Sequence, residues 1–530
     1  MTLHQSGDED GTVEKQRPSP PTARKVKKTS QKSSRKSLYQ WHSWVGFHLA
    51  AIMSIILATG TIATLSNEID WLIQHDMRVT PNGDKVSLGR MIDAVREAAP
   101  EHHLASFARM EGDHFAYRAT LFTETGKRYF MHVNQWTGEV TGTTHVITVQ
   151  RIFRDLHRYL FMPSVPGLPL VTSFAFILSI SLYTGLKTSR NWITLATRIR
   201  FSKGARIAVG DAHKAVGLWS IWFFAVMIVT SLWYLTEFGA AVGGERFEPD
   251  RPKLSVERQA TLPPLIYDAP VSGISAQVEA HFPDLRFATI FFPLRPQDAV
   301  RVTGYDGNPL LRERANQIFL DPETHEVIEI IREGEIGWGA YLNEMADPLH
   351  FGNFGGLPTK LIWFVFGLGM TGLSLTGVWL TWKRLKTVAP SRAQFATFPV
   401  LILSMVACYF WYERFQGVTV PDNLVAMEAL AFEDVELKPY ITRNDGVYGG
   451  EVFITASHPE RRLALRKIVV SLDQADDEGL VSNDARLRVF GKNLIATARI
   501  PAARIASGTR MTIQVEALSG REWTFNLVAP

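Results

Sequence analysis

Four histidines recur in matched positions along the chain, and imidazole is a common ligand of transition metals in proteins. His42 and His213 are each followed by valine and glycine at the third and fourth positions. His157 and His350 each follow a leucine and precede a Gly-Leu-Pro sequence at the start of an apolar run. This recurrence predicts an internal duplication that supplies two pairs of histidines, one member of each pair from each copy.

Apolar runs are the elements that must position these histidines. Each run is long enough to cross about 30 Å of hydrocarbon as a helix. The fifth contains Gln394 and Pro399, so an interfacial segment is the alternative there. The five uncharged runs are Ser43–Ser66, Phe161–Leu186, Ala215–Thr236, Leu361–Trp382 and Ala393–Tyr412.

The composition limits the kind of centre that the chain can hold. The 530 residues include fifteen histidines and one cysteine, Cys408, which excludes an internal disulfide framework, a cysteine zinc site and an iron–sulfur cluster. The formal net charge is +4. Because the basic residues lie beside apolar runs, they indicate contact with membrane lipid, and we expect no nucleic-acid partner.

The distribution of basic residues predicts the orientation. Residues 1–37 form a basic tail without a core-forming composition, and the connections 187–214 and 383–392 are also basic. The positive-inside rule places these segments in the cytoplasm. We therefore expect a multi-pass protein of the bacterial inner membrane, with a cytoplasmic N-terminus and a periplasmic C-terminal domain.

The predicted fold class is an α-helical membrane protein: a duplicated four-helix bundle, a fifth helix, two periplasmic α+β domains and a C-terminal all-β domain. The predicted parts are a disordered tail at 1–37, TM1 at 38–66, outer domain 1 at 67–150, an interfacial helix with TM2 at 151–186, a cytoplasmic loop at 187–214, TM3 at 215–236, outer domain 2 at 237–348, TM4 at 349–382, TM5 at 393–412 and a β-sandwich at 420–530.

The two outer domains share an order of patterns. The first has helical spacing from Leu88 to Val95, then alternating strands that end in the turn Asn134–Val140. The second has a helix near Ile274–Ala280, then strands and the turn Asp321–Val327. Both turns read Asn/Asp-x-x-Thr-x-Glu-Val, which supports the duplication.

A parallel duplication places equivalent residues at equal depth in the membrane. His42 and His213 are then paired near the cytoplasmic face, and His157 and His350 near the periplasmic face. Two facing imidazoles in a helical bundle suit the two axial positions of a haem iron. We therefore predict two b-type haems, each with two histidine ligands.

His48 is the alternative inner ligand, because an ionisable residue within a span is costly and usually functional. It lies six residues after His42, on a different face of a helix. His42 has the repeat counterpart His213, whereas the counterpart of His48 is Trp219. We prefer His42, and a satisfied core histidine also explains His48.

The sequence carries no dinucleotide or phosphate-binding glycine motif, so no flavin or nicotinamide site is evident. The predicted electron donor is therefore a membrane quinol or a separate reductase.

Together, these motifs resemble the PepSY-associated transmembrane proteins. The resemblance rests on His42-Ser-Trp-Val-Gly, Asp211-Ala-His-Lys-Ala-Val-Gly-Leu-Trp219, Leu349-His-Phe-Gly-Asn-Phe-Gly-Gly356 and the two outer turns, and it covers about residues 38–386. The fifth run and the C-terminal domain lie outside this pattern, and Lys214 stands where the family often has arginine.

The family includes iron-regulated inner-membrane proteins and ferric-siderophore reductases that carry haem within the bundle. The resemblance therefore implies PepSY-like outer domains and an enzyme, a haem-dependent oxidoreductase whose periplasmic acceptor is ferric siderophore iron. A non-haem scaffold or regulator that binds a periplasmic peptide or protein is the alternative. A transporter is a further rival, although neither half shows a mid-membrane acid.

Overall fold

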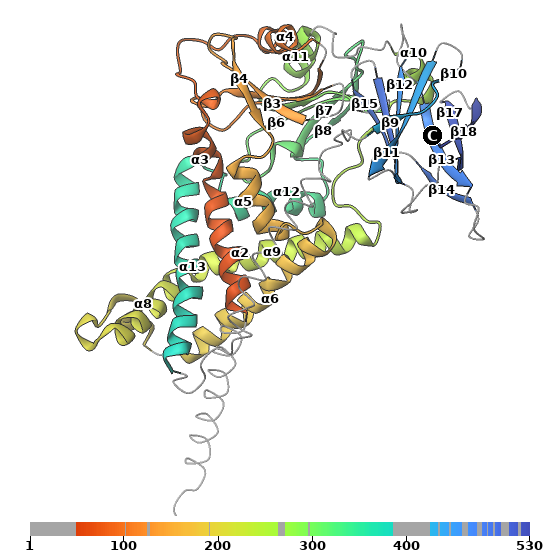
Figure 1. The fold of residues 1–530 in the computed structure, drawn as a ribbon. Helices are drawn as coiled ribbons and strands as arrows, with labels where there is room; N and C mark the ends of the chain where they lie inside the picture. The colour runs from red at the N-terminus through yellow and green to blue at the C-terminus, as the bar shows by residue number, and fades with distance from the viewer. Residues whose placement is uncertain are drawn as a thin grey trace, which may run out of the picture.

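The fold is known from a computed structural model, shown in Figure 1. The structure describes residues 49–384 except 101, 124–127, 190, 263–270 and 295–296, together with most of 424–529. The predicted tail, His42, His48 and the fifth apolar run lie outside the described residues.

Three helices are long and apolar enough to cross a membrane: α6 (Ser164–Thr188), α9 (Ile221–Val242) and α13 (Leu357–Arg384). A fourth candidate combines α2 (Ala50–Thr64) with α3 (Ser66–Ile73), which meet at a bend of 60°. Leu65, between them, has non-helical backbone angles. The described residues thus contain three candidate spans, or four if the bent pair is one span.

The third span differs from the prediction of 215–236. A break at Ser220 separates α8 (Ala205–Trp219) from α9, so His213 lies in a helix of its own ahead of the span. Glycine and serine are poor helix formers, and Gly217 and Ser220 both lie next to this break. The expected loop at 187–214 accordingly contains α7 (Trp192–Thr197) and most of α8.

Two shorter helices precede spans and carry the other histidines. The helix α5 (Val149–Tyr159) packs against α2 and α6, and α12 (Trp338–Phe351) packs against α9. The spans themselves pair as α2 with α13 and α6 with α9, while α8 packs against α13. The helical bundle is therefore assembled from segments that are far apart in sequence (Figure 1).

One eight-stranded sheet lies at one end of the helices (Figure 1). Its order is β4-β3-β2-β1-β5-β6-β7-β8. The antiparallel pairing of β1 with β5 joins the strands of the two outer segments, with Phe107 opposite Ile290. The strands are β1 (His103–Ala108), β2 (Tyr117–Phe122), β3 (Arg128–Val133), β4 (Val140–His145), β5 (Arg286–Phe291), β6 (Val300–Tyr305), β7 (Asn316–Leu320) and β8 (Val327–Ile331).

The helices α4 (Leu88–Ala98) and α11 (Val271–His281) contribute to a single core with this sheet. Met91, Ile92 and Val95 of α4 are buried in it, as the helical spacing requires, and so is Ile274 of α11. The two outer segments thus share one hydrophobic core and one sheet instead of forming separate domains.

The two sequence turns connect equivalent strand pairs. Asn134 accepts a hydrogen bond from the Trp136 amide at 2.9 Å in the β3–β4 turn. Asp321 accepts from the amides of Glu323 and Thr324 at 2.9 and 3.0 Å in the β7–β8 turn.

The C-terminal strands form two sheets around one core, to which Ile441 and Val452 of one sheet and Ile468 and Ile513 of the other contribute. One sheet has the order β10-β11-β12-β16-β15, with β9 paired to β11, and the other has the order β14-β13-β17-β18. The strands are β9 (Leu424–Ala426), β10 (Leu430–Phe432), β11 (Val435–Asn444), β12 (Val447–Ser457), β13 (Leu465–Asp473), β14 (Leu480–Asp484), β15 (Arg486–Phe490), β16 (Asn493–Arg499), β17 (Arg510–Ala517) and β18 (Glu522–Val528). The remaining short elements are α10 (Val256–Thr261), η1 (His75–Met77), η2 (Phe201–Lys203) and η4 (Glu313–Ala315).

Candidate functional site

The structure brings His157 of α5 and His350 of α12 together. Their ring centroids are 6.0 Å apart, with an angle of 36° between the ring planes. We call these two side chains the outer pair. His213 lies elsewhere, in α8 against α13, and α8 is distant from α12 in Figure 1.

His157 is held against α2. Its Nδ1 atom lies 2.8 Å from the carbonyl oxygen of Ile56. A carbonyl oxygen only accepts hydrogen bonds, so Nδ1 carries the proton and donates it, and Nε2 keeps its lone pair. Gly60 makes this approach possible, because a Cβ at that position would lie 2.6 Å from Cε1 of His157.

His350 is held against α9 by different groups. Its Nδ1 atom lies 2.9 Å from the Thr230 hydroxyl. The edge of the Tyr234 ring packs against the imidazole with centroids 5.3 Å apart. The Tyr234 hydroxyl in turn donates to Asp347, one turn before His350, at 2.6 Å.

An ion-pair network extends from Asp347 toward the sheet. Arg312 contacts both Asp347 and Glu344, the latter at 2.9 Å. Arg314 also binds Glu344 at 2.9 Å. Since Glu344 is only 2 % exposed, these arginines compensate a carboxylate that has lost nearly all of its hydration. The network fixes α12 to the loop between β6 and β7.

Both rings of the outer pair are neutral near pH 7. Both side chains lie on helices, α5 and α12, that precede the candidate membrane spans in the chain. Burial lowers the pKa of His157. Burial, with a smaller contribution from the facing His157, lowers the pKa of His350 to about 3. Neutral imidazole is the form that binds a metal.

His213 has a similar arrangement at another place in the bundle. Its Nδ1 atom lies 2.8 Å from the hydroxyl of Thr376 in α13. A Cβ on Gly377, the next residue, would lie 3.6 Å from Cε1 of His213, so the ring lies close to the α13 backbone.

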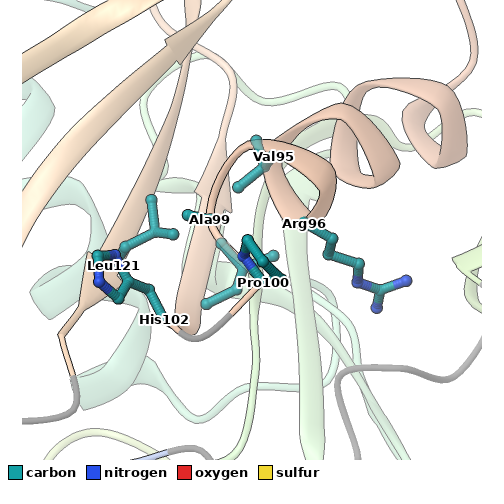
Figure 2. A pocket seen from close by; sticks show the side chains of 7 residues that line it. Val95, Arg96, Ala99, Pro100, His102 and Leu121 are labelled. Carbon is teal, nitrogen blue, oxygen red and sulfur yellow. The ribbon is translucent and has the colours of Figure 1, made fainter.

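The hollow between α4 and β1 is a weaker candidate (Figure 2). Its two polar side chains, Arg96 and His102, extend in opposite directions (Figure 2). His102 is already bonded to the Tyr129 hydroxyl at 2.7 Å. This hollow therefore lacks convergent polar groups.

Sequence reasoning missed Gly60, Thr230, Tyr234 and Thr376. One signal is present in the sequence, because Thr376-Gly377 in α13 repeats Thr184-Gly185 in α6. Thr230 carries a similar signal, because Thr59 lies 171 residues before it, which is also the separation between His42 and His213.

Apolar helices that surround a histidine pair, next to an external antiparallel sheet, define a multi-pass membrane protein with a candidate metal-binding site in its bundle. The chain belongs to the family described as the PepSY-associated TM region, whose model matches residues 39–384. The family predicted from the sequence is thus confirmed. No curated protein matches this chain.

Proposed function

We propose that this protein is a haem-containing reductase of the bacterial inner membrane. It passes electrons across the membrane to a periplasmic acceptor, ferric iron held by a siderophore. The observation that carries the proposal is the outer pair, two neutral histidines from separate helices with ring centroids 6.0 Å apart. Nδ1 of each ring is hydrogen-bonded, to the Ile56 carbonyl oxygen in one case and to the Thr230 hydroxyl in the other.

The spacing of the outer pair fits one iron between two imidazoles. A metal–nitrogen bond is about 2 Å long, so the 6.0 Å between the ring centroids would leave room for one metal ion held by both imidazoles. Hydrogen bonds on Nδ1 orient each ring and leave Nε2 as the donor atom, as in other histidine metal sites.

The number of protein ligands favours haem over a bare ion. No cluster of three or more His, Cys, Asp or Glu side chains suited to a metal occurs among the described residues. A metal on the outer pair must therefore bring its remaining ligands with it, as iron does in a porphyrin. A bound haem would supply a one-electron centre whose potential the protein sets through its axial ligands.

The inner half of the proposed path uses His213 with His42, or with His48 as the substitute. The electron donor is a quinol or a separate reductase on that side. In the reaction, one electron reduces Fe(III) of the chelate to Fe(II). Hard oxygen donors bind Fe(II) less tightly, which releases the iron.

The first experiment is an absorption spectrum of protein purified in detergent from cells with adequate haem. We expect a Soret band that weakens in His157→Ala and in His350→Ala. His145→Ala is the control, because this histidine is exposed and bonds only to the Ile147 amide among the described residues. Absence of the band from the unmodified protein would favour the non-haem scaffold or regulator.

The second experiment tests the acceptor. Protein reduced with dithionite and freed of excess reductant should be reoxidised by a ferric hydroxamate. The gallium complex of the same hydroxamate is the control, because Ga(III) has the same charge and does not accept the electron. Equal spectra with both complexes would exclude ferric siderophores of this class as acceptors.

The orientation is tested separately. Figure 1 places the C-terminal strands at the same end of the helices as the eight-stranded sheet, which supports one common compartment. A reporter fused after residue 412 should report the periplasm. A cytoplasmic result would contradict the fifth span.

A further inference from the structure

We infer that Thr230 and Thr376 fix which ring nitrogen of His350 and His213 carries the proton, and so direct Nε2 of each ring to a metal. This deepens the proposed function and rests on it for the metal. The position of the proton on each imidazole ring depends only on groups of this chain, so it can be measured without a metal.

The argument begins with the single proton of a threonine hydroxyl. Thr230 lies 2.8 Å from the carbonyl oxygen of Val226, one turn earlier in α9. Thr376 lies 2.6 Å from the carbonyl oxygen of Gly372 in α13. Because a carbonyl oxygen cannot donate, each hydroxyl donates its proton to its own helix.

Each hydroxyl oxygen is then left as an acceptor toward histidine. Nδ1 of His350 is 2.9 Å from the Thr230 oxygen, and Nδ1 of His213 is 2.8 Å from the Thr376 oxygen. The opposite tautomer would place a nitrogen lone pair against an oxygen whose proton is already used. The Nδ1-protonated form is therefore favoured at both sites.

Burial makes this preference effective at Thr230. Thr230 is 3 % exposed, so water does not offer the ring an alternative partner on that side. His157 reaches the same tautomer through the Ile56 carbonyl, which is part of the main chain. The threonines are thus the positions at which a side-chain substitution can remove the acceptor.

A second consequence concerns the metal. A hydrogen bond from Nδ1–H raises the basicity of the ligating nitrogen, and loss of such a partner typically lowers metal affinity about 10- to 100-fold. Thr230→Val keeps the shape of the side chain and removes the acceptor. We expect this variant to lose haem from the outer pair at least about 10-fold more readily, and the midpoint potential of that haem to rise because ferric iron is less stabilised.

The experiment compares Thr230→Val, Thr230→Ser and Thr172→Val in the full chain. Thr172 is also buried, and its hydroxyl donates to the Leu168 and Pro169 carbonyl oxygens of its own helix. The haem-free readout is ¹⁵N NMR of protein labelled at histidine, with His350→Ala assigning the signal. The haem-bound readout is the midpoint potential.

We expect His350 to be Nδ1-protonated in the unmodified protein, in Thr230→Ser and in Thr172→Val, and to become a mixture of tautomers in Thr230→Val. An unchanged tautomer in Thr230→Val, or a serine variant that behaves like valine, would overturn the inference. If the unmodified protein lacks haem but the tautomer responds as expected, the proposed function fails and the role of Thr230 stands.

Discussion

The helices α5 and α12 carry the two histidines of the outer pair, yet their surroundings differ. On α5, His157 bonds to a main-chain carbonyl and rests on a glycine. On α12, His350 bonds to a threonine hydroxyl and packs against Tyr234. The ring position is thus secured by backbone on one side and by side chains on the other, so the two halves should respond to different substitutions.

The two helices are also anchored to their surroundings in different ways. Asp70 of α3 accepts hydrogen bonds from the amides of Val149 and Gln150, at 2.7 and 2.9 Å, and so fixes the first turn of α5. The α12 helix is fixed along its length, through Glu344 and Asp347 bound by Arg312. Asp70 of α3 therefore positions α5, whereas Arg312 of the outer segment positions α12.

The largest expected effect is on the α5 side. Gly60→Ala would place a Cβ 2.6 Å from the His157 ring, and the ring must move because the α2 backbone is rigid. We expect haem on the outer pair to be lost at least about 10-fold more readily, since ligands must hold their geometry closely. Haem content after dilution measures this.

Gly239→Ala in α9 is the matched control, since no atom lies within 4 Å of its added Cβ. This control should bind haem normally, because alanine is favoured over glycine in helices. Normal haem retention in Gly60→Ala would contradict the close contact of His157 with α2.

A smaller effect is expected from the ion pairs of α12. Arg312→Met would remove the shared partner of Glu344 and Asp347 but leave Arg314 bound to Glu344. We therefore expect a destabilisation below the roughly 3 kcal/mol of a fully broken buried pair. Thermal unfolding in detergent should show a lower midpoint.

Arg154→Met on α5 serves as the comparison, because this arginine is exposed and such surface changes are usually within about 0.5 kcal/mol. Equal midpoints for the two variants would show that the arginine network does not stabilise α12.

The smallest effect concerns the two outer turns. Asp321, Glu323 and His325 of one turn stand where the other turn has Asn134, Trp136 and Gly138. Burial acts to raise the pKa of the Asp321 carboxyl. Hydrogen bonds from Arg258 and from the Thr324 and Glu323 amides together outweigh burial and lower this pKa from 3.8 to about 2. The carboxylate therefore stabilises the turn above about pH 4, and this stability is lost as the pH falls toward 2.

The equivalent residue in the other turn is Asn134, which does not titrate in this range. Amide exchange, corrected for its intrinsic rate, should show the β7–β8 turn losing protection in acid while the β3–β4 turn keeps it. Asp321→Asn should reduce this difference, and a parallel loss in both turns would contradict the assignment.

The sequence predicted much of this arrangement, and the failures have physical causes. Uncharged runs identified α6 and α13 because hydrocarbon selects against charge over a whole helix. The break at Ser220 was missed because a span can tolerate serine, and only the packing of α8 against α13 reveals it. Residues 103–108 were not predicted as a strand, although β1 joins the two outer segments.

The candidate site was predictable only in its two histidines. Recurrence identified His157 and His350, and the structure places their ring centroids 6.0 Å apart. Their hydrogen-bond partners come from helices about one hundred residues away in sequence, and one partner is a carbonyl that every residue possesses. The sequence immediately around each histidine therefore does not predict these two hydrogen bonds.

The central claim is that His157 and His350 bind the same iron. Haem per chain, measured in His157→Ala, His350→Ala and the double variant, tests it directly. The account predicts that each single variant loses one haem of two and that the double variant loses no more, because both substitutions empty one site. A double variant that loses more haem than the single variants would place the two histidines on different irons and contradict the account.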